Sequence, residues 1–245
     1  MKALIRKSMW ATVILVWIAC SVSSVSAETS TTNDGWKFGL ELYFWGASIG
    51  GASSDGSNVD VDLDDILDNL ELAVMGTAAM SKGKWSLAAD MIYLNAEADG
   101  PIAPGLNADV ELTNWVITPV VGYNVVDTGR GRLDIVGGAR YLYLKGELRV
   151  DALGARAEDS GSNWDGVIGA RGSVDLAEKW YLLGYLDIGT GESDLTWQAM
   201  GGIGYRFKWF DLVAVYRYLR WDFDDNPALD NLYIHGPGAG IRFAF

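Results

Sequence analysis

The chain has 245 residues, of which 49% are hydrophobic, with 30 Gly, 11 Trp, 11 Tyr and 5 Pro, and a formal net charge of −13. Abundant glycine and interfacial aromatic residues argue against an ordinary soluble enzyme. The acidic balance excludes a nucleic-acid-binding protein, because no basic surface is available to cover phosphates. The single cysteine, Cys20, excludes a disulfide framework.

The first 27 residues have the three parts of a secretory signal peptide. An apolar segment, residues 9–19, lies between a basic start and small residues that end at Ala27. It is too short to span a bilayer, which takes about 20 residues. A lipoprotein signal at Cys20 is the weaker alternative, because Trp17 stands where such signals have Leu, Val or Ile. Cleavage after Ala27 leaves a domain of residues 28–245 with a net charge of −16.

Beyond Ala27 the hydrophobic pattern has a period of two residues, which predicts β-strands. No apolar run there approaches 18 residues, which excludes transmembrane helices. Every second residue of 36–44 is apolar, whereas Lys37, Gly39, Glu41 and Tyr43 lie between. Ten such segments are predicted: 36–49, 71–80, 85–96, 110–125, 132–148, 164–176, 180–189, 195–207, 210–221 and 232–245.

The connections between these segments alternate between short ones and mostly longer ones, which is typical of an outer-membrane barrel. We therefore predict an all-β fold, a transmembrane antiparallel up-and-down β-barrel of ten strands, with eight strands as the alternative. A soluble two-sheet sandwich competes with this interpretation. It is disfavoured because the second face of the strands carries Gly, Ala, Asp and Arg, and Gly weakens a strand in water. Aromatic residues near strand ends predict girdles at both membrane surfaces: Trp36, Trp85, Tyr123, Trp180, Tyr205, Tyr216 and Tyr218.

The last predicted strand carries Ile241, Phe243 and Phe245 on one face, with an aromatic residue at the final position. Such an ending predicts a strand that is paired to its last residue, since chain ends in soluble domains usually fray. It resembles the C-terminal signal by which the barrel-assembly machinery recognises outer-membrane barrels.

Several further segments resemble a group of proteobacterial outer-membrane β-barrel proteins, distantly similar to the outer-membrane protein A and W barrels. They are "GLELYFWGASIGG", "VDVDLDDILDNLELAVMG", "GARYLYL", "SDLTWQAMGGIGYRF" and "YRYLRWDF". The resemblance implies a location in the outer membrane and a monomer. Its implied partners are membrane lipid, lipopolysaccharide, periplasmic chaperones and the assembly machinery. It implies no biochemical activity, because the group has no agreed one.

The interior of the predicted barrel holds charges of both signs in comparable numbers. Strand parity points these residues inward: Lys37, Glu41, Asp90, Asp134, Arg140, Asp165, Arg171, Asp187, Arg206, Asp211, Arg217 and Arg242. In a narrow barrel they predict a salt-bridged interior that side chains fill. The same charges are also compatible with a narrow pore.

Seven carboxylates between Asp55 and Glu71 form an acidic segment. It lacks the Gly and the bidentate Glu of a calcium loop, so a solvated rim or a short amphipathic turn over the barrel mouth is expected. If Ca²⁺ or Mg²⁺ binds weakly there, we expect Asp62, Asp64 and Asp65 as ligands. No other cofactor is expected.

Catalysis has little support in the sequence. The one histidine, His235, falls by parity on the membrane face and lacks the neighbouring Ser of the lipid A deacylases and the neighbouring Asp of the omptin proteases, two groups of barrel enzymes. A structural or surface-interaction barrel is therefore the first hypothesis for the function. A narrow channel or uptake protein for small solutes or hydrophobic molecules is the second, and an enzyme that acts on lipid or peptide is the third.

Overall fold

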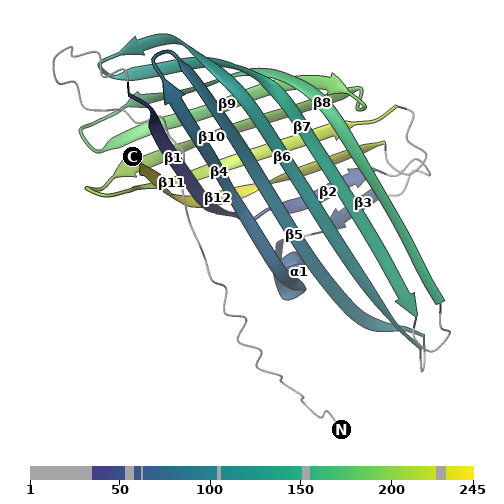
Figure 1. Ribbon diagram of the computed structural model, residues 1–245. Helices are drawn as coiled ribbons and strands as arrows, with labels where there is room; N and C mark the ends of the chain where they lie inside the picture. Colours follow the sequence, from purple (N-terminus) through teal and green to yellow (C-terminus); the bar gives the residue numbers. More distant parts are fainter. Residues whose placement is uncertain (1–34, 53–57, 62, 104–105, 151–154, 225–229) are drawn as a thin grey trace.

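The alternating segments pair in sequence order, and the first strand pairs with the last, so the sheet closes into a barrel (Figure 1). This computed structural model describes residues 35–52, 58–61, 63–103, 106–150, 155–224 and 230–245. The predicted signal peptide, residues 1–27, lies outside the described residues. Among those that are described, no helix is long and apolar enough to cross a membrane.

Ten strands of the described chain form the closed sheet, which confirms the ten-stranded antiparallel barrel. They are β1 (Lys37–Trp45), β4 (Leu70–Lys82), β5 (Trp85–Ala103), β6 (Leu106–Thr128), β7 (Gly131–Val150), β8 (Ala155–Asp175), β9 (Trp180–Gly191), β10 (Leu195–Arg206), β11 (Asp211–Asp222) and β12 (Asn231–Ala244). Three short elements connect β1 to β4: β2 (Ser48–Ala52), β3 (Asn58–Val61) and α1 (Leu63–Asp68). β2 continues along β12 in the same register as β1, so the predicted strand over 36–49 is interrupted only at Gly46 and Ala47.

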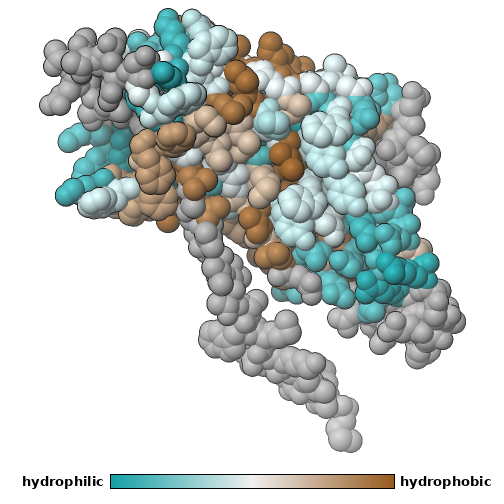
Figure 2. All heavy atoms as spheres, in the orientation of Figure 1, coloured by the Kyte–Doolittle hydropathy of each residue, from teal (hydrophilic) through white to brown (hydrophobic). Residues whose placement is uncertain are grey.

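The outer and inner faces of the barrel sheet differ in polarity, as the period of two predicts. Outward side chains are apolar and exposed, as at Ile168 (62%) and Trp36 (57%), whereas inward carboxylates such as Asp134 (2%) are buried. A soluble protein has the opposite arrangement, because burial of apolar surface drives its folding. Figure 2 shows the hydrophobic residues over the middle of the visible face, with hydrophilic residues toward both ends.

Aromatic pairs mark the two ends of this apolar band. Near the short turns, Trp85 packs on Tyr123 with ring centroids 4.9 Å apart, and toward the other end Tyr93 packs on Trp115 at 4.5 Å. Trp85 and Tyr93 are eight residues apart on β5. At about 3.3 Å per residue and a tilt near 40°, that spacing spans about 20 Å, close to the apolar height of membrane barrels. We call the end of the barrel with the short turns the turn end. We call the opposite end the wall end, after the extended strands that are described next.

Four strands extend far beyond the aromatic pairs at the wall end. β5 pairs with β6 as far as Ala103 and Leu106, and β7 pairs with β8 as far as Val150 and Ala155. The predicted loops over 97–109 and 149–163 are therefore wrong. The Gly and Pro residues in 97–109 indicated a loop, but an antiparallel ladder outside lipid is held by its backbone hydrogen bonds and needs no apolar face. We call residues 94–103, 106–114, 144–150 and 155–163 the wall, which Figure 1 shows at the lower right.

The last residue closes the barrel. The N–H of Phe245 donates to the carbonyl of Phe38 at 2.8 Å, the N–H of Phe38 donates back at 3.0 Å, and the Phe245 side chain is 76% exposed on the outer face. The predicted pairing to the final residue is thus confirmed, and Ile241 and Phe243 share the outer face of β12 with Phe245.

Replacing Phe245 by Asp, or deleting it, is expected to leave the exported chain unassembled. The last strand loses its aromatic side chain, and Asp adds a charge to the lipid-facing surface. An assembled barrel migrates faster on a denaturing gel before heating than after, so the variant should lack the fast band. Phe245→Tyr keeps a ring and the backbone pairing to Phe38 and should assemble. A fast band of normal intensity for Phe245→Asp would contradict the prediction.

Candidate functional site: the barrel interior

At the turn end, the interior is filled by a network around Tyr181. Arg242 donates to the Tyr181 hydroxyl at 3.1 Å and lies 3.6 Å from the carboxylate of Glu41. Arg206 stacks on the Tyr181 ring, 4.6 Å from its centroid, and pairs with Asp175 at 2.6 Å. Four strands, β1, β8, β10 and β12, therefore converge on a side chain of a fifth, β9.

A second group joins two arginines to one carboxylate. Asp134 accepts hydrogen bonds from Arg132 at 3.0 Å, from Arg171 at 3.1 Å and from the Asn124 amide at 2.8 Å. Arg171 extends further and donates to the hydroxyl of Ser86 on β5 at 2.6 Å. The group carries one more positive than negative charge.

Arg217 is the centre of a third group at mid-height. It donates to Asp90 at 2.9 Å, to the Tyr43 hydroxyl at 3.0 Å and to the Gln198 carbonyl at 2.8 Å, and it lies over the ring of Trp45 at 4.9 Å. All three nitrogens of this guanidinium have partners, so its position is fixed across the lumen.

Arg140 forms the most deeply buried ion pair. It lies 2.5 Å from Asp187 and donates to Thr196 at 2.9 Å, and the side chains of both members of the pair are 0% exposed. Asp165, which is next to Arg140 in the β7–β8 register, instead accepts from Asn163 at 2.7 Å. A buried pair of this kind is held by its geometry, since each charge would be costly alone.

The structure brings most of the sequence-predicted interior residues together. Inward placement holds for Glu41, Asp90, Asp134, Arg140, Asp165, Arg171, Asp187, Arg206, Asp211, Arg217 and Arg242, whereas Lys37 lies exposed at the first position of β1. The partners could not be chosen from the sequence. Asp187 pairs with Arg140, and Asp134 pairs with Arg171.

An apolar cluster that was not predicted from the sequence fills the wall-end half of the interior. Leu219 and Trp221 are both 0% exposed. They belong to a cluster that also contains Trp45, Ala47, Met75, Ile92, Val116, Leu142, Leu232 and Ile234. Its signal was present, because these residues have inward parity. On β7 and β11 the apolar residues directly continue an inward charge, as Leu142 follows Arg140 and Leu219 follows Arg217.

The acidic segment is only partly described. Asp64 is exposed on α1, Asp65 lies on α1 with its side chain outside the described residues, and Asp62 lies outside them altogether. The short amphipathic turn that the sequence predicted over the barrel mouth corresponds to the helix α1, in which Ile66 is 8% exposed and lies against apolar residues of the barrel mouth. The weak divalent-ion site stays a prediction.

His235 lies outside the interior. Its Nδ1 is 2.9 Å from the Tyr216 hydroxyl, and its ring stacks against Tyr218 and Tyr233 on the outer face. The histidine is thus part of the aromatic residues at the wall end of the apolar band, as its parity predicted.

Arg140→Ala is expected to lower the free energy of unfolding by about 3 to 5 kcal/mol, because the substitution leaves Asp187 charged and buried without a cation. Arg171→Ala should cost less, since its side chain is 22% exposed and Asp134 keeps Arg132 as a partner. Urea unfolding in detergent measures both. Arg220→Ala, at a pair that is about one-third exposed, is the matched control and should stay within about 1 kcal/mol. Equal urea midpoints of unfolding for Arg140→Ala and the unmodified protein would show that water reaches the Arg140–Asp187 pair and would contradict the prediction.

Comparison with known proteins supports the fold. No family model and no curated protein matches the chain. The outer membrane protease OmpT from Escherichia coli is similar, with a TM-score of 0.52 and 12% identity over 91% of this chain and 100% of that chain. The translocator domain of the autotransporter NalP from Neisseria meningitidis gives 0.45, 16%, 90% and 91% for the same quantities. Ail, the attachment invasion locus protein of Yersinia pestis, gives 0.37, 12%, 85% and 97%.

At 12% identity the likeness to OmpT shows the architecture alone. The chain therefore has the fold of the bacterial outer-membrane β-barrels, as its resemblance to them predicted.

Proposed function

We propose that the protein is a monomeric outer-membrane β-barrel with a structural and surface-interaction role. The outward apolar band, bounded by aromatic residues about 20 Å apart, fits a bilayer. By the usual orientation of such barrels, the turn end lies in the periplasm and the wall lies outside the cell. Contacts with membrane lipid and lipopolysaccharide, and assembly through periplasmic chaperones and the barrel-assembly machinery, belong to the same proposal.

The closed interior is the observation that carries this role. Arg140, Leu219 and Trp221 are 0% exposed at the wall-end side of the Arg217 group. An open pore would leave water-accessible side chains along its whole length. Here side chains fill the wall-end half of the interior, as expected of a small barrel.

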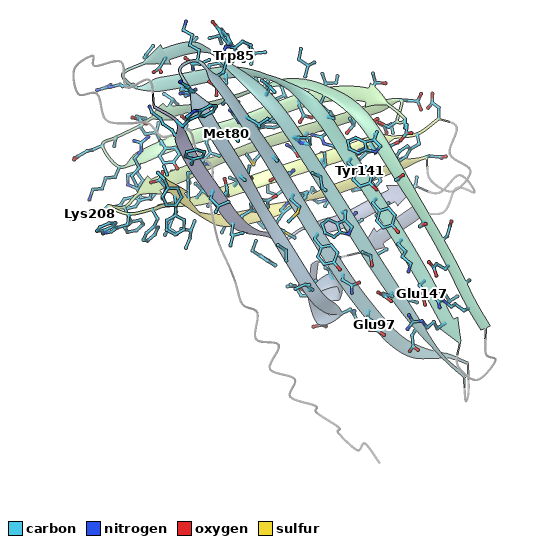
Figure 3. The ribbon with its side chains drawn as sticks, in the orientation of Figure 1. Met80, Trp85, Glu97, Tyr141, Glu147 and Lys208 are labelled. Carbon is cyan, nitrogen blue, oxygen red and sulfur yellow. The ribbon has the colours of Figure 1, made fainter. Side chains whose placement is uncertain are left out.

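The wall supports a role at the cell surface. It continues β6 for about nine residues beyond the aromatic belt, which corresponds to about 30 Å along the strand. Figure 3 shows Tyr141 at the level of the belt and Glu97 and Glu147 further along the wall. Val110 and Leu148, which are 47% and 42% exposed, point to the opposite face of this sheet. A broad two-faced sheet outside the membrane is a surface suited to contact other molecules.

A narrow channel is the second candidate, because a cavity of about 170 Å³ occupies the turn-end half of the interior. Conduction would require the apolar cluster and the Arg140–Asp187 pair to move aside. We propose no enzymatic activity, since His235 faces outward, away from the interior carboxylates.

Purified protein in planar bilayers is expected to give no channel events, and liposomes that contain it should not swell in sugar solutions. Leu219→Ala combined with Trp221→Ala truncates two fully buried apolar side chains of β11 and should produce measurable conductance. Leu212→Ala with Tyr216→Ala, which truncates two outward side chains of the same strand, is the control and should give no channel events. Channel events from the unmodified protein would favour the uptake hypothesis instead.

Glu147 is the centre of an ion cluster on the outer face of the wall. Its side chain is 2% exposed and contacts Arg149, Arg156 at 2.9 Å and Lys145 at 3.4 Å. The hydrogen bond from Arg149 lowers the pKa of Glu147 below its usual value. The cluster therefore stabilises the wall above the carboxylate's unfolded pKa, and this contribution is lost as the pH falls through the folded pKa.

Glu147→Gln is expected to loosen the β7–β8 part of the wall at neutral pH, because three cations lose a shared carboxylate. Trypsin should then cut faster after Arg149 and Arg156, as measured by the mass of the released fragments. Glu158→Gln removes a carboxylate that is 44% exposed in the same cluster and should change the rate much less. Equal cleavage of both variants and the unmodified protein would show that the cluster contributes nothing to the wall.

A further inference from the structure

The cavity in the turn-end half of the barrel has a lining that neither closure nor a structural role requires. It measures about 170 Å³ and lies between the Tyr181 network and the Arg217 group. Arg132, Arg171, Arg217 and Arg242 line it together with three carboxylates, Glu41, Asp90 and Asp134.

The charges around this cavity are unevenly distributed. Asp90 pairs with Arg217, and Glu41 pairs with Arg242. Asp134, in contrast, is the one carboxylate that pairs with both Arg132 and Arg171. The lining therefore carries one positive charge in excess, at the Arg132–Asp134–Arg171 group. In a confined space this excess favours a bound anion.

Two guanidinium nitrogens of the lining lack a partner within the described part of the chain. Arg132 Nη2 and Arg242 Nε are buried and donate to no acceptor of the described residues, and Arg242 as a whole is only 9% exposed. The Thr118 hydroxyl, on β6, is in the same state. Buried donors normally have an acceptor, since leaving one unsatisfied costs about 1 to 3 kcal/mol and more for a charged group.

Part of the remaining lining is polar, with Thr77, Ser173 and Gln198 among its side chains. The apolar part consists mainly of Ala88, Val120, Leu183, Tyr185, Met200 and Val215. A ligand that satisfies the whole cavity thus needs an anionic group for the arginines and a compact apolar body. An apolar protein cavity of about 150 Å³ holds benzene, so a single ring is of the right size.

We propose that this cavity binds a small organic acid, with its carboxylate on Arg132 and Arg171 and its apolar body against β9 to β11. Arg132 is the second residue of β7, next to a short turn, so the carboxylate end lies nearest the periplasm. The apolar cluster closes the other end. The cavity is therefore a binding site that is closed at the wall end, and not a segment of a passage.

The experiment uses the full mature chain in detergent micelles and radiolabelled benzoate in equilibrium dialysis, with empty micelles subtracted. Saturable binding by the unmodified protein is expected, weakened at least tenfold in Arg171→Gln and in Arg132→Gln. Arg220→Gln, an equal substitution outside the cavity, should bind as the unmodified protein does. Benzyl alcohol, which has the ring without the charge, should not compete.

Met200→Trp tests the same site without touching an arginine, because it fills the apolar part and should abolish binding. The fast-migrating gel band shows which variants are assembled. The proposal is overturned if the unmodified protein shows no saturable binding. It is also overturned if assembled Arg171→Gln and Arg132→Gln keep full affinity, or if benzyl alcohol competes as well as benzoate.

Discussion

Satisfaction of every backbone hydrogen bond in lipid is the constraint on which the rest of the structure depends, since an unpaired group there costs several kcal/mol. β12 meets it along most of its length, with β11 on one side and β1 and β2 on the other. β1 and β4 meet it differently: their ladder includes Lys37–Ser81 and Phe38–Met80, whereas the N–H of Trp45 bonds to the sulfur of Met75 at 3.3 Å. Here the inward Met75 side chain of β4 takes the place of a backbone carbonyl as the acceptor. Directly after this point the chain leaves β4, because β2 pairs with β12 and β3 instead.

Closure with ten strands leaves a narrow interior, which long side chains can enter only where nearby strands carry small residues. Gly122 provides such a place, because a Cβ there would lie 3.0 Å from the Arg171 guanidinium and 2.6 Å from the Ser86 hydroxyl. Gly204 does the same for Tyr181, whose ring would lie 2.1 Å from an added Cβ. The high glycine content thus follows from the interior networks: small residues on one strand make room for Arg and Tyr from another.

The period of two was sufficient to predict the strands, the inward set of charges and the closing role of Phe245, because strand parity is a local property. Ion pairing is not local. Whether Arg140 meets Asp187 or Asp165 depends on the stagger of strands around the barrel, and Asp187 is two strands away while Asp165 is directly opposite. The wall was missed because its strands carry charges and Gly-Pro signals instead of an apolar alternation. α1 was foreseen only as a short amphipathic turn, since six residues give too little periodicity to separate a helix from a turn.

The outer face of β7 contacts lipid along one part of the strand and water along the next. Ile135, Tyr141 and Tyr143 point outward within the apolar band, and Lys145 and Glu147 continue on the same face without a change of register. The inward face changes in the opposite sense, from Arg140 to Leu142 and then to Leu148, which is 42% exposed. Polarity therefore exchanges faces between Tyr143 and Lys145, although strand geometry does not. Such an exchange is expected where a strand leaves lipid for water, because the face that was bathed in lipid must then be hydrated. It places the membrane boundary on the chain from chemistry alone and makes the apolar inner face of the wall continuous with the apolar cluster that closes the barrel.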